Sequence, residues 1–562
     1  MDRIMPVGYE DLKEIIDKGL YYVDKTLMIK NLLDLGGKVN LFTRPRRFGK
    51  TLNQSMLRRF FEKELDGDGN QIDNSYIFRG LQIASCGERY LSKQGRFPVI
   101  NLTLKSAKQD TFESAYYKIR EEIAEEFRRH AYLLNAPGLT ETEKQRFREI
   151  ADEKAEYDVY SGSLKFLSKC LYTATGEKAI ILLDEYDVPL ENAYFSGFYE
   201  KMTAFIRSLF ESALKTNPNM EFAVITGCLR ICRESIFTGL NNLDIYSILN
   251  PDFADSFGFT EEEVMSALSY YEIENKADEV KCWYDGYCFG GREIYNPWSI
   301  INYVKSASRN PETFPKPYWS NTSSNSIVKE LVEQADIETR EEIENLLEDK
   351  AIEKTLHEDI TYGDIGESRD NLWNFLFFTG YLKKVGERYD GEKVYFKLAI
   401  PNTEVRSIYR NTIMTWFEKK IEESDLSPLF SAMENGDCDA FGKLISAQLL
   451  ESISFYDYSE NYYHGFLAGL LKNSHIYGVY SNRESGTGRP DILVKTRSVR
   501  DGRAFILELK VAKSFDEMEE ACQNAISQIE DRNYEASLRQ EGYRSIKKYG
   551  IAFFRKECLV KK

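Results

Sequence analysis

Hydrophobic runs and amphipathic stretches alternate along the first 240 residues. Four runs of β-branched or aliphatic residues, each bounded by polar positions, predict strands at 39–43, 99–104, 179–185 and 222–227. Between the second and third runs, residues 110–134 place apolar side chains three or four positions apart, which is the spacing of a helix with one buried face. Strands separated by long helices form parallel sheets covered on both faces. The pattern therefore predicts an α/β domain.

The pattern changes after residue 250. Acidic helical stretches dominate here, for example at 260–271 and 337–354, and indicate a helical lid. An aromatic loop at 283–297 lies between these two stretches. The next elements are predicted in the order helix, strand, strand, helix, at 372–381, 382–385, 394–400 and from 403 onward. This order is typical of a winged-helix-like fold, although a small α+β connector of another kind fits it equally well.

A second α/β pattern occupies the end of the chain. A helical region at 441–471 precedes the strands, and a long helix at 515–534 lies before the last of them. The strands are predicted at 476–480, 491–496, 504–511 and 549–554. The patterns together predict four parts with boundaries near residues 250, 345 and 430.

Composition narrows the class of protein. The chain of 562 residues is long enough for about three or four domains. Its longest aliphatic runs are strand-sized, far below the ~20 residues of a membrane helix, and its first residues lack the basic and apolar regions of a signal peptide. Nine Cys without metal-like Cys-x-x-Cys pairs indicate free thiols in a reducing compartment. We therefore expect a cytoplasmic protein with no membrane partner.

The net charge of −16 argues against a general nucleic-acid coat, which would be basic. The charge is unevenly distributed. Residues 431–562 hold 19 basic and 19 acidic residues, so the whole excess of acidic residues lies on the first 430. The last part of the chain is therefore where a polyanion could approach most easily.

A phosphate-binding loop is predicted after the first strand. The strand at 39–43 runs into a loop that ends in Gly49-Lys50-Thr51, and an amphipathic helix follows. In such a loop, backbone N–H groups cradle phosphates, the Lys reaches the β- and γ-phosphates, and the Thr holds Mg²⁺. The general motif places a Gly at position 44, where this chain has Arg44. The predicted nucleotide ligands are Arg46, Arg47, Phe48, Gly49, Lys50 and Thr51.

The apolar run at 180–183 ends in two carboxylates and supplies the second half of a nucleotide site. Asp184 would help to hold Mg²⁺, and Glu185 would orient the attacking water. Thr226 at the end of the next strand is a candidate sensor of the γ-phosphate. Arg230 or Arg233 is a candidate for stabilising charge in the transition state, or else a surface or capping arginine. The alternative is a buried strand whose polar end meets solvent, and the sequence does not separate ATP from GTP or binding from hydrolysis.

Several motifs resemble a known family, the bacterial AAA-ATPase-like proteins, whose members commonly carry a C-terminal domain of the PD-(D/E)XK nuclease superfamily. The motifs are Tyr22-Val23-Asp24-Lys25-Thr26, the loop 44–51 with Arg44, Leu183-Asp184-Glu185-Tyr186-Asp187, the segment 235–242 and Tyr284-Asp285-Gly286-Tyr287. The resemblance covers nearly the whole chain, and Arg44 belongs to the family's pattern. It implies an AAA-like P-loop ATPase domain and a C-terminal restriction-endonuclease-like domain. Together with the patterns above, we expect the ATPase domain at 1–250, a helical lid at 251–345, a winged-helix-like connector at 346–430 and the nuclease-like domain at 431–562.

A metal site is predicted in this last part. Asp491 opens one strand, and Glu508 and Lys510 share one face of the next, because side chains alternate along a strand. Two carboxylates can bind Mg²⁺ or Mn²⁺, and Lys510 can orient the attacking water. Gln528 is a candidate fourth polar group and Glu460 an additional metal carboxylate. The alternative is a salt bridge of Lys510 in a purely structural domain.

The Glu-x-Lys spacing alone is weak support, since the chain repeats it at 274–276 and 348–350 in stretches that resemble solvated helices. The pair Glu508 and Lys510 differs because its strand is otherwise apolar, and a charged group there needs a partner or a metal. His464 is expected to be a packed helix residue rather than a catalytic one. The aromatic residues at 283–287 and 295–298 are expected to pack the lid rather than to stack on bases.

The predicted protein binds and hydrolyses ATP and cleaves nucleic acid under nucleotide control in a metal-dependent reaction, with DNA favoured over RNA by the resemblance. One alternative is an ATP-dependent switch or scaffold whose nuclease-like domain binds a partner without cutting. Another is a DNA motor, which the net charge and the lack of helicase motifs disfavour. The sequence does not decide whether the protein forms a homo-oligomer. A role in defence against phage or mobile elements fits the architecture, although no residue specifies that role.

Overall fold

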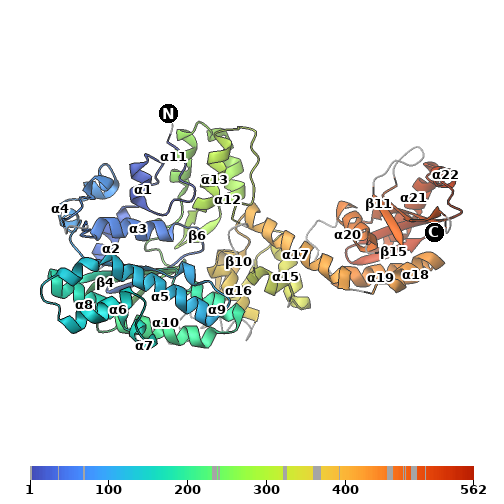
Figure 1. The fold of residues 1–562 in the computed structure, drawn as a ribbon. Helices are drawn as coiled ribbons and strands as arrows, with labels where there is room; N and C mark the ends of the chain where they lie inside the picture. The colour runs from blue at the N-terminus through green and yellow to red at the C-terminus, as the bar shows by residue number, and fades with distance from the viewer. Residues whose placement is uncertain are drawn as a thin grey trace. The chain divides into compact units, whose positions relative to one another are not determined.

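A computed structural model gives the fold of the chain (Figure 1). It describes residues 3–35, 37–66, 70–230, 237, 241–319, 326–333, 335–358, 369–391, 393–423, 425–451, 460–472, 474, 476–481, 490–499 and 502–562. The chain divides into two compact units. The first comprises residues 1–327 and 353–407, and the second 328–352 and 408–562. The finer division into four parts stays a prediction.

The first unit is built on a five-stranded parallel sheet in the order β2-β3-β4-β1-β5. The strands are β1 (Val39–Thr43), β2 (Val99–Thr103), β3 (Ala179–Asp184), β4 (Met220–Gly227) and β5 (Leu243–Tyr246). All residues of β1 and β3 are buried, as expected of strands covered on both faces. The predicted parallel α/β architecture is thus confirmed. β5 was not predicted, because this edge strand is short and only partly buried.

Helices before and between these strands cover the sheet (Figure 1). They are α1 (Leu12–Asp17), α2 (Leu27–Leu35), α3 (Lys50–Phe61), α4 (Glu88–Leu91), α5 (Phe112–Arg129), α6 (Glu141–Ala151), α7 (Tyr157–Ser161), α8 (Ser163–Thr175), α9 (Val188–Ser196) and α10 (Tyr199–Leu214). α5 forms inside the predicted helix, where Thr111 caps its first turn by accepting a hydrogen bond from the backbone N–H of Ser114. Its buried face carries Ile119, Ile123 and Phe127.

A small helical cluster follows the sheet in the first unit. It contains α11 (Glu261–Tyr270), α12 (Ala277–Tyr284) and α13 (Pro297–Ala307). Leu268, Tyr284 and Ile300 belong to its buried core. The aromatic loop between α12 and α13 folds into a hairpin of β6 (Tyr287–Phe289) and β7 (Arg292–Ile294). The sequence pattern indicated a loop at this hairpin because each strand has only three residues.

The predicted order of helix, two strands and helix is present as α16 (Arg369–Phe378), β9 (Lys383–Asp390), β10 (Lys393–Ala399) and α17 (Thr403–Glu423). A third strand, β8 (Ile352–Thr355), pairs in the order β8-β10-β9. The prediction of a continuous helix over 337–354 was therefore wrong at its end. α15 (Ile337–Leu347) stops before Asp349, whose φ of 63° is left-handed and breaks the helix. α14 (Ser326–Glu333) precedes it.

The second unit contains a five-stranded mixed sheet in the order β11-β12-β13-β14-β15. Only β13 and β14 pair in parallel. The strands are β11 (Tyr477–Ser481), β12 (Ile492–Thr496), β13 (Arg503–Val511), β14 (Ser545–Phe554) and β15 (Glu557–Lys561), the last of which was not predicted. The helices that follow α17 in this unit are α18 (Ser427–Asn435), α19 (Cys438–Glu451), α20 (Glu460–Lys472), α21 (Met518–Asp531) and α22 (Glu535–Gln540), and the unit also includes α15 and parts of α14 and α17.

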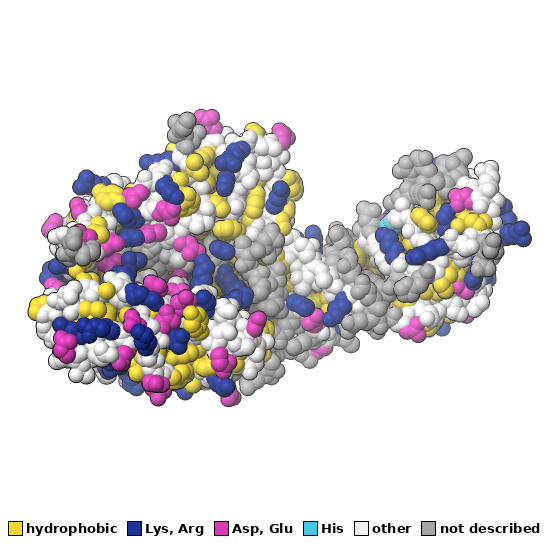
Figure 2. All heavy atoms as spheres, viewed as in Figure 1, with side chains coloured by type: hydrophobic (Ala, Val, Ile, Leu, Met, Phe, Trp, Pro, Cys, Tyr) yellow, Lys and Arg dark blue, Asp and Glu magenta, His cyan; other side chains and the backbone are white. Residues whose placement is uncertain are grey.

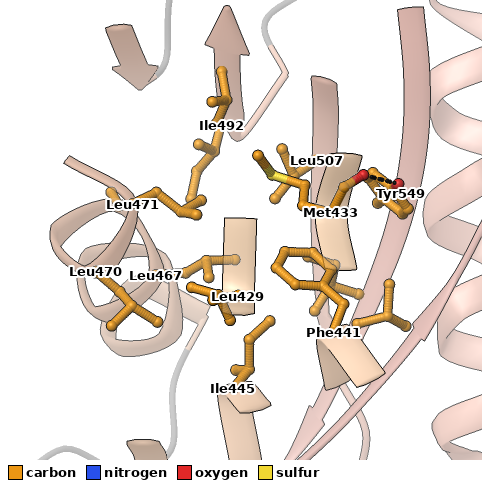
Figure 3. Packing of buried hydrophobic residues seen from close by; sticks show 14 of the residues in the cluster. Leu429, Met433, Phe441, Ile445, Leu467, Leu470, Leu471, Ile492, Leu507 and Tyr549 are labelled. Carbon is orange, nitrogen blue, oxygen red and sulfur yellow. Dashed lines mark hydrogen bonds between the residues drawn. The ribbon is translucent and has the colours of Figure 1, made fainter. Parts of the chain in front are cut away.

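Helices α18, α19 and α20 bury their apolar faces against this sheet (Figure 3). Phe441 and Ile445 of α19 and Leu467 of α20 are fully buried in the same core as Leu507 of β13. The hydroxyl of Tyr549 donates a hydrogen bond of 2.6 Å to the carbonyl of Met433, so this buried polar atom is satisfied. The core fixes β13, which carries Glu508 and Lys510 of the candidate metal site. Among the described residues, no helix combines the length and the apolar character needed to cross a bilayer.

Candidate nucleotide and metal sites

The predicted phosphate-binding loop connects β1 to α3. Gly49 precedes the first residue of α3 with φ of 85°, a left-handed conformation that glycine adopts without strain. The loop therefore turns directly into the helix N-terminus, whose free N–H groups favour anions. Lys50 and Thr51 are the first two residues of α3, as the motif requires.

Arg44 is fully buried under this loop. Its Nη1 donates hydrogen bonds to the carbonyls of Thr43 (2.9 Å) and Tyr246 (2.7 Å), and its guanidinium lies 5.1 Å from the ring centre of Phe257. Burial lowers the pKa of Arg44 to about 9. These contacts make Arg44 a support of the loop, which explains in physical terms how an arginine can stand where a glycine is usual.

The other loop side chains are directed to different neighbours. Arg46 forms an ion pair with Glu191, and Arg47, exposed and at φ of 70°, lies with its guanidinium 4.5 Å from the ring centre of Trp298. Phe48 is buried, with its ring centre 4.9 Å from that of Tyr287 in the β6–β7 hairpin. Any phosphate contact by Phe48 would therefore come from its backbone.

Lys50 is 3% exposed and reaches several acceptors at the end of the sheet. Its Nζ donates to the carbonyls of Arg44 (3.0 Å) and Pro45 (3.2 Å) and lies 3.5 Å from Oε1 of Glu185. Burial alone would lower the pKa of Lys50, but the facing Cys228 and carboxylates raise it above its usual value. Lys50 is thus held as a cation.

Asp184, Thr51 and Thr226 meet at the carboxyl end of β3. Asp184 accepts hydrogen bonds from the hydroxyls of Thr51 (2.7 Å) and Thr226 (2.5 Å). Burial and the adjacent Glu185 raise the pKa of Asp184 to about 6. The structure thus brings together the predicted Mg²⁺ ligands Thr51 and Asp184 and the predicted sensor Thr226.

Glu185 has φ of 53°, a left-handed conformation that non-glycine residues seldom adopt. Its Oε2 is buried without a hydrogen-bond partner among the described residues. Two neighbours were missed in the sequence: Asp187 and Cys228, whose ligand atoms lie within 4.8 Å of one another and of Glu185. Asp187 lies in the quoted Leu183–Asp187 motif, but only the fold brings it to Cys228, whose backbone N–H donates to it at 2.7 Å.

Arg230 lies beyond the end of β4, with its Nη1 3.8 Å from Oε2 of Glu358. It is not among the described residues that line the neighbouring cavity. Arg233, the other arginine considered, lies outside the described residues, as does most of the 235–242 motif.

A cavity of about 330 Å³ opens over the loop. Residues 46–53 and Glu185 form one side of it, and the N-terminal segment with Pro6 and Tyr9 forms another. Tyr22 and Lys25 of the 22–26 motif and Trp298 of α13 also line it. The predicted phosphate-binding residues therefore line one open cavity, while Asp184 and Thr226 are not part of its lining and contact it through Thr51.

In the second unit, Asp491 and Glu508 are brought together by the pairing of β12 with β13. The register places Ile492 opposite Leu507, so Asp491 falls beside Glu508. The backbone N–H of Asp491 donates to Oε2 of Glu508 at 3.4 Å, and the backbone N–H of Leu509 donates to Oδ2 of Asp491 at 2.8 Å. Two carboxylates thus share one edge of the strands, as expected from the sequence.

Lys510 and Gln528 complete this group. Nζ of Lys510 lies 3.9 Å from Oε1 of Glu508, and Nε2 of Gln528 on α21 donates a hydrogen bond to the same oxygen. Glu508 is 1% exposed, and burial together with the neighbouring Asp491 raises its pKa to about 7. A buried carboxylate beside a second one is the setting in which a divalent cation would be stabilising.

Helix α20 contributes Glu460 and His464, one turn apart. Glu460 is exposed, and its charge adds to the rise in the pKa of Glu508. Nε2 of His464 lies 2.8 Å from the backbone carbonyl of Asp491 and 3.0 Å from Oγ of Ser481. From the sequence, His464 was expected only to pack within its helix. Its contact with Asp491 could not be predicted, because only the fold brings α20 to the start of β12.

Comparisons with known proteins agree with this arrangement. A family profile described as "Predicted AAA-ATPase" matches residues 6–237, and a profile described as "PD-(D/E)XK nuclease superfamily" matches residues 458–562. A protein of Azotobacter chroococcum mcd 1, described as "Uncharacterized protein in vnfD 5'region", is 25% identical over 562 residues, covering 98% of this chain and 96% of that protein. The chain therefore carries an N-terminal domain of the AAA-ATPase-like family and a C-terminal domain of the PD-(D/E)XK nuclease superfamily.

Proposed function

We propose that the chain is a nucleotide-controlled nuclease, which binds and hydrolyses ATP in its first unit and cleaves phosphodiester bonds of nucleic acid, DNA rather than RNA, in its second. The observation that carries the proposal is that Asp491, directly before β12, lies beside Glu508 of β13, whose carboxylate is 3.9 Å from Nζ of Lys510. The superfamily match over this unit supports a nucleic-acid substrate.

The residues of the second unit fit a divalent cation. Asp491 and Glu508 would hold Mg²⁺ or Mn²⁺, with Glu460 as a further ligand, since hard cations prefer carboxylate oxygens. Such an ion supplies positive charge that polarises the phosphate and acidifies the attacking water. The raised pKa of Glu508 fits this role, because a cation would offset its burial and its repulsion by Asp491.

The chain's own groups would then position the reaction. The hydrogen bond from Gln528 orients Glu508, and the N–H of Leu509 orients Asp491. Lys510 would donate to the attacking water and balance the charge that develops on the phosphate as the leaving oxygen departs. The backbone contact of His464 with Asp491 would steady the start of β12.

The first unit would supply the nucleotide control. The backbone of residues 46–49 would bind the phosphates, Lys50 would neutralise their charge, and Thr51 with Asp184 would hold Mg²⁺. Glu185 would orient the attacking water, Thr226 would sense the γ-phosphate through Asp184, and Arg230 would stabilise charge in the transition state. The division into ATPase, lid, winged-helix-like connector and nuclease parts, and a homo-oligomer as the working form, belong to this proposal.

The test is cleavage of labelled single- and double-stranded DNA and RNA with Mg²⁺ or Mn²⁺, with and without ATP. We expect cutting by the wild type and at least a 100-fold loss in Asp491→Ala and Lys510→Ala. A matched control is the double variant Glu348→Gln/Lys350→Ala, which removes the same Glu-x-Lys spacing from an exposed ion pair of 2.6 Å. This control should cut like the wild type.

The same assay separates the alternative function. If no substrate is cut under any condition while Lys50→Ala still changes assembly or partner binding, the chain is a nucleotide switch whose nuclease-like unit only binds. If only RNA is cut, the proposed substrate would change from DNA to RNA, while the proposed hydrolysis of phosphodiester bonds would stand.

A further inference from the structure

Helix α17 begins with a buried carboxylate. Glu404, its second residue, is fully buried and accepts hydrogen bonds from the hydroxyl of Ser299 at 3.0 and 2.8 Å and from the backbone N–H of Trp319 at 2.8 Å. These donors are neutral, so hydrogen bonds rather than an ion pair hold the carboxylate among the residues that the structure describes. A buried acid that lost such donors would be strongly destabilising.

Trp319 connects Glu404 to the phosphate-binding loop. Its backbone binds Glu404, and its indole Nε1 donates a hydrogen bond of 3.2 Å to the carbonyl of Arg46. The side chain is 1% exposed, and its ring centre lies 4.9 Å from that of Tyr381. One residue thus touches both the loop and the start of α17.

A hydrogen bond to the carbonyl of Arg46 affects the orientation of the neighbouring backbone N–H group in the phosphate-binding loop. The peptide group that contains this carbonyl also contains the N–H of Arg47, and a planar trans peptide directs the two in opposite directions. Fixing the carbonyl from one side therefore fixes where the Arg47 N–H points on the other. That N–H is one of the backbone donors proposed to bind phosphate.

A second contact joins the loop to the same region. Gly380, which follows α16, has φ of 91°, and a Cβ at this position would lie only 3.0 Å from Cβ of Pro45. The loop and the segment Gly380–Tyr381 are thus packed closely enough that a shift of one displaces the other.

We propose that Trp319 and Glu404 are positioning residues that couple the backbone of the phosphate-binding loop to the first turn of α17. The proposal rests on nucleotide binding at this loop, as proposed above. Phosphates that pull on the Arg47 N–H would strain the Arg46–Trp319 contact, and the strain would reach Glu404 and its helix. Along the chain, α17 starts in the first unit and continues into the second, as α14 and β8 also cross between the units. Of these three elements, α17 is the one whose first turn contains Glu404, so it is a route by which the nucleotide site can act on the C-terminal residues.

The test compares Trp319→Phe, which keeps the ring but removes the indole N–H, with Glu404→Gln and with the double variant. Affinity for a fluorescent ATP analogue is measured with Mg²⁺, together with the rate of trypsin cleavage within α17 with and without nucleotide. Trp283→Phe is the matched control, since its ring packs on Phe314 away from the loop.

We expect each single variant to weaken nucleotide binding about tenfold, the cost of one lost hydrogen bond, and the double variant to weaken it by much less than the product. Nucleotide should change the rate of trypsin cleavage within α17 at least threefold in the wild type and in Trp283→Phe. In Trp319→Phe, nucleotide should leave this rate unchanged. Ser299→Ala provides a milder variant of the same contact if Glu404→Gln does not fold.

Wild-type affinity in Trp319→Phe, or fully multiplicative effects in the double variant, would overturn the coupling while leaving the nucleotide site intact. A wild type that binds no nucleotide would instead remove the proposed function, and this inference with it. Lys50→Ala distinguishes the two results, because it should abolish binding only if the site is real.

Discussion

At the scale of single residues, the proposed nucleotide site depends on side chains outside its set of proposed ligands. Arg44 is the clearest case, because its buried guanidinium binds main-chain carbonyls of β1 and β5 and supports the loop above it. The sequence placed an arginine where a glycine is usual but could not indicate its partner, since Tyr246 lies 202 positions away. Glu404 and Trp319 escaped prediction for the same reason.

Arg44→Ala should therefore lower stability without removing any phosphate ligand. We expect a loss of about 3 kcal/mol, because several buried carbonyls would lose their donor and a cavity would form. Urea unfolding followed by tryptophan fluorescence measures this loss. Arg47→Ala, at an exposed position, should stay within about 0.5 kcal/mol of the wild type. Equal losses in both variants would contradict the structural role of Arg44.

Glu404 makes stability depend on pH. Burial raises its pKa to about 7 from its usual 4.5, and the facing Tyr284 and Tyr287 stay protonated because burial raises their pKa as well. The folded state therefore binds a proton more tightly than the unfolded state. This contribution is complete below pH 4.5 and is lost as the pH rises through 7, by about 3 kcal/mol in total.

Glu404→Gln should remove this dependence. The difference in unfolding free energy between Glu404→Gln and the wild type should shift in favour of the variant as the pH rises from about 5 to about 8. Urea titrations at several pH values in this range would measure it, with Glu353→Gln, at the exposed position of β8, as control. A difference that stays constant across the range would show that Glu404 does not titrate there.

At the scale of elements, periodicity located most of the helices and strands. β1 is found at its predicted bounds, and the strands that carry Asp184, Glu508 and Lys510 are found to within one residue. These strands are buried, so their apolar runs are unbroken. The elements that were missed, such as β5, β8 and β15, have four or five residues with polar positions among them, and pairing partners rather than local pattern decide their state.

The β12–β13 register brings together the residues of the proposed metal site. A slip of one residue would turn every side chain of one strand to the other face and separate Asp491 from Glu508. We therefore expect Mg²⁺ or Mn²⁺ at about ten times its dissociation constant to raise the melting temperature of the wild type by about 2–4 °C. Asp491→Asn should abolish this shift, and the exposed Asp516→Asn should keep it, as measured by calorimetry without nucleotide. An equal shift in both variants would place the ion elsewhere.

At the scale of the whole molecule, the two candidate sites lie in separate units of one chain. The acidic excess belongs to the part before residue 431, and acidic and basic side chains are intermixed over the first unit on the face seen in Figure 2. The C-terminal part is electrically balanced, so a polyanionic substrate meets less repulsion there. The sequence alone suggested both candidate sites. It could not indicate that Trp319 contacts both the first turn of α17 and the phosphate-binding loop, because these segments are far apart in the sequence.

Nucleotide bound in the first unit is expected to control cleavage in the second. The most direct measurement is the single-turnover cleavage rate of labelled DNA with and without ATP, for the wild type, Lys50→Ala and Asp491→Ala. We predict that ATP changes the wild-type rate at least tenfold, that Lys50→Ala cuts at one rate whether or not ATP is present, and that Asp491→Ala does not cut. A wild-type rate that ATP leaves unchanged, or cutting that persists in Asp491→Ala, would contradict this central claim.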